Sequence, residues 1–302
     1  MNNGWMYREQ VERSAAGTTV LDYYTQRYRH SNRSEWASRI QSRQVLLDDA
    51  ETTVEAVLLA GQWLTYHRAP WQEPDVPLAF EVLYEDAALT VVAKPSGLPV
   101  LPGGGFLEHT LLWQLQQRYP QETPLPIHRL GRGTSGLMLL ARSPDARAHL
   151  SQQLRDRQMQ KIYRALAQGN SMPDRFSITE PIGKQPHPVL GYVYAAHPQG
   201  ALAQSDCQVL RRDAETALLD VTILTGRPHQ IRIHLAATGY PLVGDPLYAI
   251  GGMPLIQPPS ENGRLPVPGD CGYHLHALHL SFTHPNGQLM TFTCSPPPVL
   301  AV

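Results

Sequence analysis

The stretch "HRLGRGTSGLMLLAR", residues 128–142, joins a loop of unusual composition to a short apolar run. Its first nine residues contain two arginines, three glycines and a Thr-Ser pair. The run "LMLLA" follows directly and is short, continuous and apolar, which is typical of a fully buried strand. We therefore predict a buried strand that is entered through a glycine-rich loop.

Segments on either side predict more strands than helices. Strands are expected at "LTVVAK" (89–94), "KIYRALAQG" (161–169) and "TALLDVTILTG" (216–226), and a hairpin is expected to turn at Asn286-Gly287. The chain also has 27 prolines and 23 glycines, which favour many loops and short elements. The fold class is therefore α+β: a mixed, mainly antiparallel sheet with flanking helices.

Two segments have the spacing of helices. "SPDARAHLSQQLRDRQMQ" (143–160) begins with Ser143 as a cap, Pro144 in the first turn and Asp145 near the positive helix end. "EHTLLWQLQQRYP" (108–120) repeats leucine at helical spacing. We assign both helices to one large domain, residues 79–302.

Three regions precede that domain. Residues 1–19 have no clear periodicity and predict a poorly ordered tail. Residues 20–68 predict a helix capped by Ser34, followed by short strands, and residues 69–78 form a proline-rich linker. The middle region, with Arg39 and Arg43 on a basic face, resembles the S4-type RNA-binding domain. A small α/β cap on the main domain is the alternative.

Composition excludes several classes of protein. The chain has 302 residues, 42% of them hydrophobic, and a net charge of -1, so any nucleic-acid footprint must be local. Its three cysteines form no C-x-x-C pair, which is typical of a reduced protein without a disulfide framework. No signal peptide and no apolar run of about 18 residues is visible. We expect a cytoplasmic protein without a membrane span.

Four segments together resemble the RluA-type RNA pseudouridine synthase family. They are residues 82–100, 128–142, 161–169 and 225–248, in that order, and the last, "TGRPHQIRIHLAATGYPLVGDPLY", is the most specific. The resemblance implies the pseudouridine synthase catalytic fold, preceded by the small S4-like domain. It also implies isomerisation of a uridine in structured RNA, ribosomal or transfer. We expect a monomer that needs no metal, no redox group and no nucleotide cofactor.

The resemblance also assigns roles to individual residues. Tyr163 is implied as the aromatic platform for a flipped uridine, with a core tyrosine as the alternative. Arg232 is implied as the base that faces the catalytic carboxylate, with a phosphate or structural contact as the alternative. The residues implied or expected to contact RNA are Arg129, Arg132, Thr134, Lys161, Arg227, His229, Gln230, Arg39 and Arg43.

The family's catalytic aspartate is replaced by Gly131, which cannot act as a nucleophile or a base. Three explanations stay open: an RNA-binding relative without catalysis, another carboxylate such as Asp86 or Asp145 in the site, or a residue changed deliberately. Gly133 also departs from the family pattern, and two neighbouring departures favour natural divergence. Arg232 then needs another acid, a water, an anion or a phosphate as its partner.

The segment from His128 to Arg164 is strongly basic. Two acids, Asp145 and Asp156, oppose eight cations there: Arg129, Arg132, Arg142, Arg147, Arg155, Arg157, Lys161 and Arg164. Such segregation in a chain of net charge -1 is what phosphate binding requires. A solvated basic helix face is the alternative.

Other patterns are weaker. The histidines His274, His276, His279 and His284 lack a cysteine or carboxylate that would complete a familiar zinc pattern, so no metal site is expected. "GTSG" is one residue short of the serine-hydrolase elbow. "LPGGGF" lacks the Gly-Lys-Ser/Thr end of a phosphate loop. Two function hypotheses remain: a pseudouridine synthase with an unusual or impaired site, and an RNA-binding or chaperone protein without catalysis.

Overall fold

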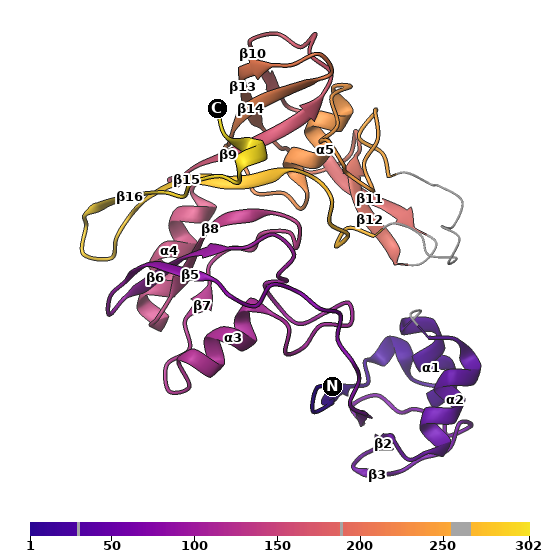
Figure 1. Ribbon diagram of the computed structural model, residues 1–302. Coiled ribbons are helices and arrows are strands. Elements are labelled where there is room, and N and C mark those ends of the chain that lie inside the picture. Colours follow the sequence, from indigo (N-terminus) through magenta and orange to yellow (C-terminus); the bar gives the residue numbers. More distant parts are fainter. Residues whose placement is uncertain (29–30, 188–189, 255–266) are drawn as a thin grey trace. The chain divides into compact units, whose positions relative to one another are not determined.

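The computed structural model describes residues 1–28, 31–187, 190–254 and 267–302. The chain divides into two compact units. The first is formed mainly by Met1–Glu73, and the second by Pro74–His187 together with Tyr192–Val302 (Figure 1). The division falls within the range that the sequence predicts as a linker, 69–78. Each unit is described by itself.

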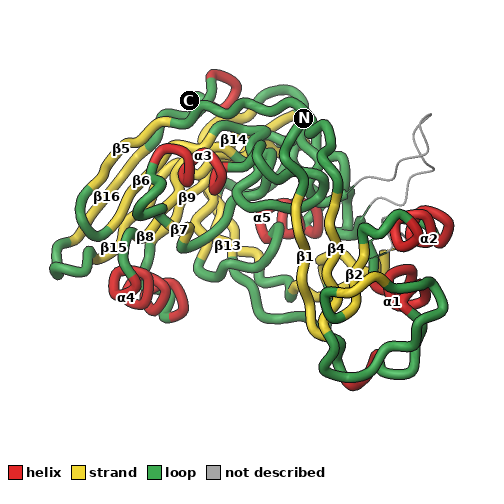
Figure 2. Tube along the Cα trace, turned by 90° about the horizontal axis from the view of Figure 1, so that it is seen from below, coloured by secondary structure: helices red, strands yellow, loops and turns green. Residues whose placement is uncertain are grey.

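The first unit is a small antiparallel sheet with two helices on one side (Figure 2). Its strands follow the order β1-β4-β2-β3. The strand bounds are β1 Trp5–Gln10, β2 Val45–Leu47, β3 Ala50–Glu51 and β4 Trp63–Arg68. The helices are α1 Val20–Arg27 and α2 Arg33–Gln41, preceded by the short 3-10 turn Arg13–Ala15. Trp36 lies at the centre of the core, among the rings of Tyr24 and Tyr66.

Two sequence predictions for this unit are wrong. Residues 1–19 are not a loose tail, because β1 pairs with β4 along its whole length and Val11 is buried. The side chains of β1 are mostly exposed, so no apolar alternation marks this strand in the sequence. Helix α2 is capped by Asn32 rather than Ser34, and Asn32 and Glu35 form a reciprocal capping box.

The second unit is built on a ten-stranded, mainly antiparallel sheet. The main path is β10-β13-β14-β9-β15-β8-β6-β5, while β16 pairs with β15 and β7 with β8. The bounds are β5 Glu81–Glu85, β6 Leu89–Lys94, β7 Leu125–Pro126, β8 Ser135–Ala141, β9 Gln160–Gln168, β10 Arg175–Ile178, β13 Ser205–Arg212, β14 Thr216–Ile223, β15 Leu275–Thr283 and β16 Leu289–Thr293. Strands β11 Ile182–His187 and β12 Gly191–Ala196 form a separate two-stranded sheet. The α+β prediction is confirmed.

Three helices flank this sheet: α3 Leu111–Arg118, α4 Pro144–Arg155 and α5 Gln230–Ala237, and a short 3-10 turn, Pro298–Leu300, lies near the C-terminus. Helix α4 is capped by Ser143 as predicted, buries Ala146 and Leu150, and packs against β8 and β15. Figure 1 shows the helix beside the sheet. The hairpin β15–β16 turns at Asn286-Gly287, also as predicted. No helix in the described ranges is long and apolar enough to cross a membrane.

The centre of the large sheet contains an exceptional parallel pair. Strand β8 runs parallel to β15 for two residue pairs, His276 with Ser135 and Ala277 with Gly136. A Cβ at Gly136 would lie 2.3 Å from the Ala277 carbonyl oxygen, so only glycine allows this approach. The pairing brings the start of β15 beside the glycine-rich loop at residues 128–134.

Candidate active site

A cavity of about 830 Å³ opens beside the glycine-rich loop in the second unit. Its walls come from residues in four separate parts of the chain: 128–132, 154–163, 223–229 and 268–269. This volume is in the range of small-molecule and cofactor sites. The cavity is therefore large enough to receive a single nucleotide.

The cavity wall carries positive charge. Among the described lining residues there is no aspartate or glutamate, and six are cationic: Arg129, Arg132, Arg155, Arg157, Lys161 and Arg227. Such a wall attracts phosphate and repels cations. The described residues of the wall offer no carboxylate for catalysis.

Strand β9 supplies Lys161 and Tyr163 to the cavity wall. The two residues lie on one face of the strand because side chains alternate with a period of two. Burial lowers the pKa of Lys161 and raises the pKa of Tyr163 to about 12, so the phenol is neutral at physiological pH. The Lys161 ammonium points toward the opposite wall, where a Cβ at Gly226 would lie 3.9 Å from its Nζ.

The loop before α5 forms that opposite wall, and the buried Gln230 side chain holds it in shape. The Gln230 Oε1 accepts hydrogen bonds from the Thr225 hydroxyl (2.7 Å) and the Arg227 backbone N–H (3.0 Å). Its Nε2 donates to the Gln204 carbonyl (2.8 Å) and the Ser205 hydroxyl (3.0 Å). The network fixes the backbone from which Arg227 and His229 reach the cavity.

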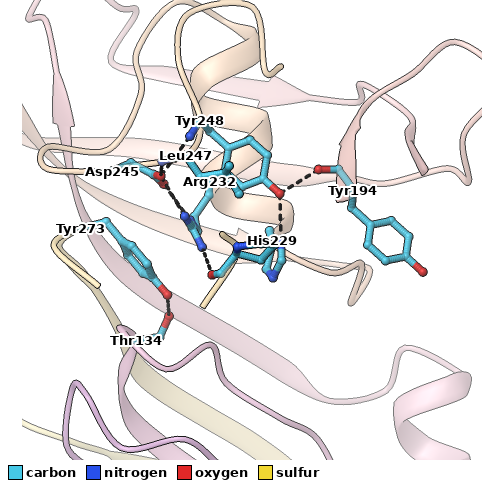
Figure 3. Close-up of polar contacts among 9 residues, drawn as sticks. Thr134, Tyr194, His229, Arg232, Asp245, Leu247, Tyr248 and Tyr273 are labelled. Carbon is cyan, nitrogen blue, oxygen red and sulfur yellow. Dashed lines mark hydrogen bonds and ion pairs between the residues drawn. The ribbon is translucent and has the colours of Figure 1, made fainter. Parts of the chain in front are cut away.

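His229 is held in one neutral form. Its Nδ1 lies 2.9 Å from the Tyr248 hydroxyl, which donates its own proton to the Tyr194 carbonyl at 2.7 Å (Figure 3). His229 Nδ1 is therefore the donor, and its Nε2 is left as an acceptor. Burial and the nearby Arg232 lower the pKa of His229 to about 3.

Arg232 lies behind this wall and is only 2% exposed. Its Nε and Nη2 donate to the two carboxylate oxygens of Asp245 at 2.7 and 2.8 Å, and its Nη1 donates to the Pro268 carbonyl at 2.8 Å (Figure 3). Asp245 also accepts the backbone N–H groups of Leu247 and Tyr248. Asp245 thus neutralises the Arg232 guanidinium, which has no carboxylate partner at position 131.

Gly131 lies on the cavity wall, and the space where its side chain would be is occupied. A Cβ built at Gly131 would lie 2.7 Å from the hydroxyl oxygen of Tyr273. Tyr273 is 4% exposed and precedes β15. Neither Asp86 nor Asp145 lies on the wall: Asp86 accepts the backbone N–H groups of a turn, and Asp145 lies in the first turn of α4.

Comparison with known proteins agrees with this geometry. Residues 88–237 match the RNA pseudouridylate synthase family model. The chain is 49% identical, over 93% of its length and 95% of the relative's, to an uncharacterized RNA pseudouridine synthase of Synechocystis sp.. The chain belongs to the RNA pseudouridine synthase family. Members of this family are isomerases.

Two further relatives extend the family match. Ribosomal large subunit pseudouridine synthase D of Nitrosomonas europaea is 33% identical over 86% of this chain and 75% of its own. The solved structure of human RNA pseudouridylate synthase domain containing 4 is 26% identical and covers 72% of this chain and 89% of its own, with a TM-score of 0.54. The pseudouridine synthase fold is thereby confirmed for the second unit.

The structure places the residues that family resemblance assigned to RNA in two groups. On the cavity wall lie Arg129, Arg132, Lys161, Arg227 and His229, together with Tyr163. Thr134 and Gln230 are buried instead and do not line the cavity: Thr134 Oγ1 lies 3.3 Å from the Tyr273 hydroxyl. The polar groups of these two residues are engaged inside the protein, and their contact with RNA stays a prediction.

Arg232 makes structural contacts, since Asp245 and Pro268 engage its guanidinium. Its role opposite a catalytic carboxylate stays a prediction. The basic segment is also less basic at its surface than its composition suggests. Arg164 pairs with Asp220 inside the sheet, and Arg142 pairs with Glu85.

Arg39 and Arg43 belong to the first unit and differ in their surroundings. The Arg39 guanidinium lies 4.6 Å from the Trp36 ring centroid and donates to the Ser31 hydroxyl. Arg43 is exposed and pairs with Glu51 at 3.2 Å. RNA binding by these two residues stays a prediction.

The histidines near the C-terminus serve separate structural purposes. His276 bonds to the Ser135 hydroxyl at 2.8 Å and to the Cys294 carbonyl at 3.0 Å, while His284 lies 2.9 Å from an oxygen of Asp86. No cluster of metal-ligating side chains is found among the described residues.

Three important residues escaped the sequence analysis. Asp245 lies in the quoted "GDPLY" segment, where a carboxylate close after Arg232 was the available signal. Lys94 is 1% exposed, and its ammonium donates to the carbonyls of Pro95, Leu98 and Arg132, which fixes the glycine-rich loop against β6. Tyr273 lies outside all four motifs, and no local pattern marks it.

Proposed function

We propose that this protein isomerises a uridine of structured RNA to pseudouridine in the cationic cavity. The observation that carries the proposal is the wall itself: six cations, with Tyr163 and Lys161 on one face of β9 in the family's positions. A uridine must leave its stack to reach the cavity, and its phosphates then meet the cationic rim. The Tyr163 ring supplies an apolar surface for the base.

We propose ribosomal or transfer RNA as the substrate. The 33% identical relative is named for the large ribosomal subunit, which favours ribosomal RNA. In the first unit, the exposed Arg43 beside Glu51 is the side chain we propose for additional RNA contacts of the S4 type. We place the protein in the cytoplasm, since its three cysteines form no C-x-x-C pair and its composition is that of a reduced protein. We also propose that it acts as a monomer.

The second candidate function is RNA binding without catalysis. It is favoured by one observation, the lack of any aspartate or glutamate among the described residues of the cavity wall. A pseudouridine synthase acts through a carboxylate in the family pattern, so its absence argues for a retained scaffold. Both functions predict RNA binding, and only the first predicts a modified base.

The deciding experiment is a pseudouridine assay with total ribosomal and transfer RNA that lacks the modification. We expect the purified protein to form pseudouridine, and Tyr163→Leu to reduce the rate, because the base loses its platform. Tyr84→Leu is the matched control, since Tyr84 lies on β5 away from the cavity. If the wild-type protein binds RNA but forms no pseudouridine, the second function replaces the first.

A further inference from the structure

One aromatic ring fills the space beside both glycines that depart from the family pattern. A Cβ at Gly131 would lie 2.7 Å from the Tyr273 hydroxyl oxygen, and a Cβ at Gly133 would lie 2.9 Å from two carbons of the same ring. Real Cβ atoms do not approach other atoms this closely. The two glycines are therefore explained together by the presence of Tyr273.

The backbone does not require glycine at either position. Neither Gly131 nor Gly133 has a positive φ, so an L side chain would suit their conformation. Lack of space is the only obstacle to a side chain at these two positions. Tyr273 itself is fixed, because its ring packs in the core and lies 4.2 Å below the Arg232 guanidinium.

The Tyr273 hydroxyl lies where an aspartate side chain at position 131 would extend. Tyr273 is 4% exposed and is not among the described cavity-lining residues, but its hydroxyl lies directly behind Gly131, which lines the cavity and has no side chain. The hydroxyl lies 3.3 Å from Thr134 Oγ1, and the positive charge of Arg232 faces the ring (Figure 3). A phenolate formed at this point would be stabilised by both groups.

We propose that Tyr273 is the catalytic residue of this protein and takes the part of the missing aspartate from the opposite side of the loop. This inference rests on the proposed isomerisation. Tyrosine is an established type of nucleophile for a sugar carbon in some glycosidases. The reacting oxygen thus belongs to a residue just before β15, whereas the family's aspartate position, 131, lies just before β8.

The chemistry balances without another reactant. The Tyr273 oxygen bonds to ribose C1′ while the C1′–N1 bond breaks, and the phenolic proton passes to the departing uracil. The base then turns, its C5 bonds to C1′, and the C1′–oxygen bond breaks. The C5 proton returns to the phenolate oxygen, so the net change moves one hydrogen from C5 to N1.

The protonation state of the Tyr273 hydroxyl suits these reaction steps. Burial raises the pKa of Tyr273, against the opposing influence of Arg232 and Thr134. The resting residue is therefore a protonated phenol that has a proton to give. Asp245 cannot replace it, because both of its oxygens are engaged by Arg232 and by backbone N–H groups.

The test compares wild type with Tyr273→Phe, which keeps the ring and removes the hydroxyl. Pseudouridine formation is expected to fall roughly 10²–10⁴-fold, the range typical of a lost catalytic proton donor or acceptor. RNA affinity and melting temperature are expected to stay within twofold and within about 3 °C of wild type. Tyr240→Phe, which removes a hydroxyl outside the cavity, is the control and is expected to keep the wild-type rate.

A second pair of variants tests the shared space. Gly131→Asp alone is expected to be destabilised and inactive, because its Cβ collides with the Tyr273 hydroxyl. Gly131→Asp combined with Tyr273→Phe removes the colliding oxygen and supplies a carboxylate in its place. The double variant is expected to be more stable than Gly131→Asp and at least tenfold faster than Tyr273→Phe.

The outcomes separate the inference from the proposed function. An active wild type with a fully active Tyr273→Phe overturns the role of Tyr273 and leaves the proposed function standing. An inactive wild type that binds RNA refutes the proposed function and the catalytic role together. An active wild type with an inactive Tyr273→Phe that still binds RNA supports both.

Discussion

At the scale of single residues, the site depends on side chains that are held in uncharged or fully engaged states. His128 is an example beside the glycine-rich loop. Its Nε2 accepts a hydrogen bond from the Leu139 backbone N–H at 3.2 Å, so this nitrogen must be unprotonated. Burial, with a smaller effect of the nearby Lys161, lowers the pKa of His128 to about 4.

The lowered pKa of His128 makes the folded protein less stable as the pH falls. The unfolded chain binds a proton at His128 near the ordinary pKa of 6.5, while the folded chain resists it down to about 4. The stabilising contribution is complete above pH 6.5 and is lost as the pH falls toward 4. As the pH falls from 6.5 to 4, we expect the free energy of unfolding to decrease less for His128→Gln than for wild type. The difference is on the order of 2 kcal/mol.

The measurement is urea denaturation at several pH values between 4 and 7. His149→Gln changes an exposed histidine on α4 and is expected to follow the wild-type slope. Parallel curves for wild type and His128→Gln would show that His128 does not cause the acid sensitivity.

Residues within a motif could be predicted from the sequence, and residues brought in from elsewhere could not. Lys161 and Tyr163 were located by resemblance to a family motif, and both reach the cavity. Tyr273 lies 139 positions after Thr134, its hydroxyl partner, and only the parallel contact of β8 with β15 brings them together. Sequence spacing contains no information about such a long-range contact.

At the scale of elements, helix α5 begins without a conventional cap. Its first flanking residue, His229, has a positive φ and its side chain does not bond to the helix. The Gln230 amide makes the polar contacts instead, to the loop before the helix and to the strand region at Gln204 and Ser205. The Gln230 side chain therefore determines how firmly the loop that carries Arg227 is held.

We expect Gln230→Leu to reduce stability by roughly 2–4 kcal/mol, because two backbone groups and two hydroxyls lose buried partners. RNA affinity should fall as well, since the Arg227 loop is released. Chemical denaturation and RNA titration measure the two effects. Gln208→Leu, on an exposed position of β13, is the control and is expected to change stability by less than about 0.5 kcal/mol. An unchanged affinity in a destabilised Gln230→Leu would contradict the link to the loop.

Elements with local signals were predictable, and elements that depend on distant partners were not. Helix α4 and the β15–β16 hairpin carry their own caps and turn residues, and both were predicted correctly. Strand β1 carries no such signal: its side chains are exposed and its order comes from β4, far along the chain. Pairing energy, not the pattern of the segment, makes it a strand.

At the scale of the whole molecule, charge is divided unevenly. The chain has one more acidic than basic residue, yet six cations gather on one cavity wall without a described acid among them. Binding to RNA should therefore depend on this one region and weaken steeply with salt, because each neutralised phosphate releases counterions.

We expect Arg129→Gln to lower affinity for all RNA sequences alike and to reduce the slope of log affinity against log salt by about one. Titrations at several potassium chloride concentrations measure the slope. Arg175→Gln removes a charge from β10, outside the cavity, and should leave the slope unchanged. Equal slopes for wild type and Arg129→Gln would place the phosphates elsewhere.

The parallel contact of β8 with β15 has a consequence for the protein's synthesis. The ribosome releases β8 and β9 early, but the strand that joins them in the sheet is near the end of the chain. Until β15 has emerged, the nascent polypeptide has neither a closed central sheet nor the tyrosine that precedes it. We therefore expect the protein to be unable to modify RNA until β15 has emerged from the ribosome, so that emergence of this strand is itself the step that completes the site.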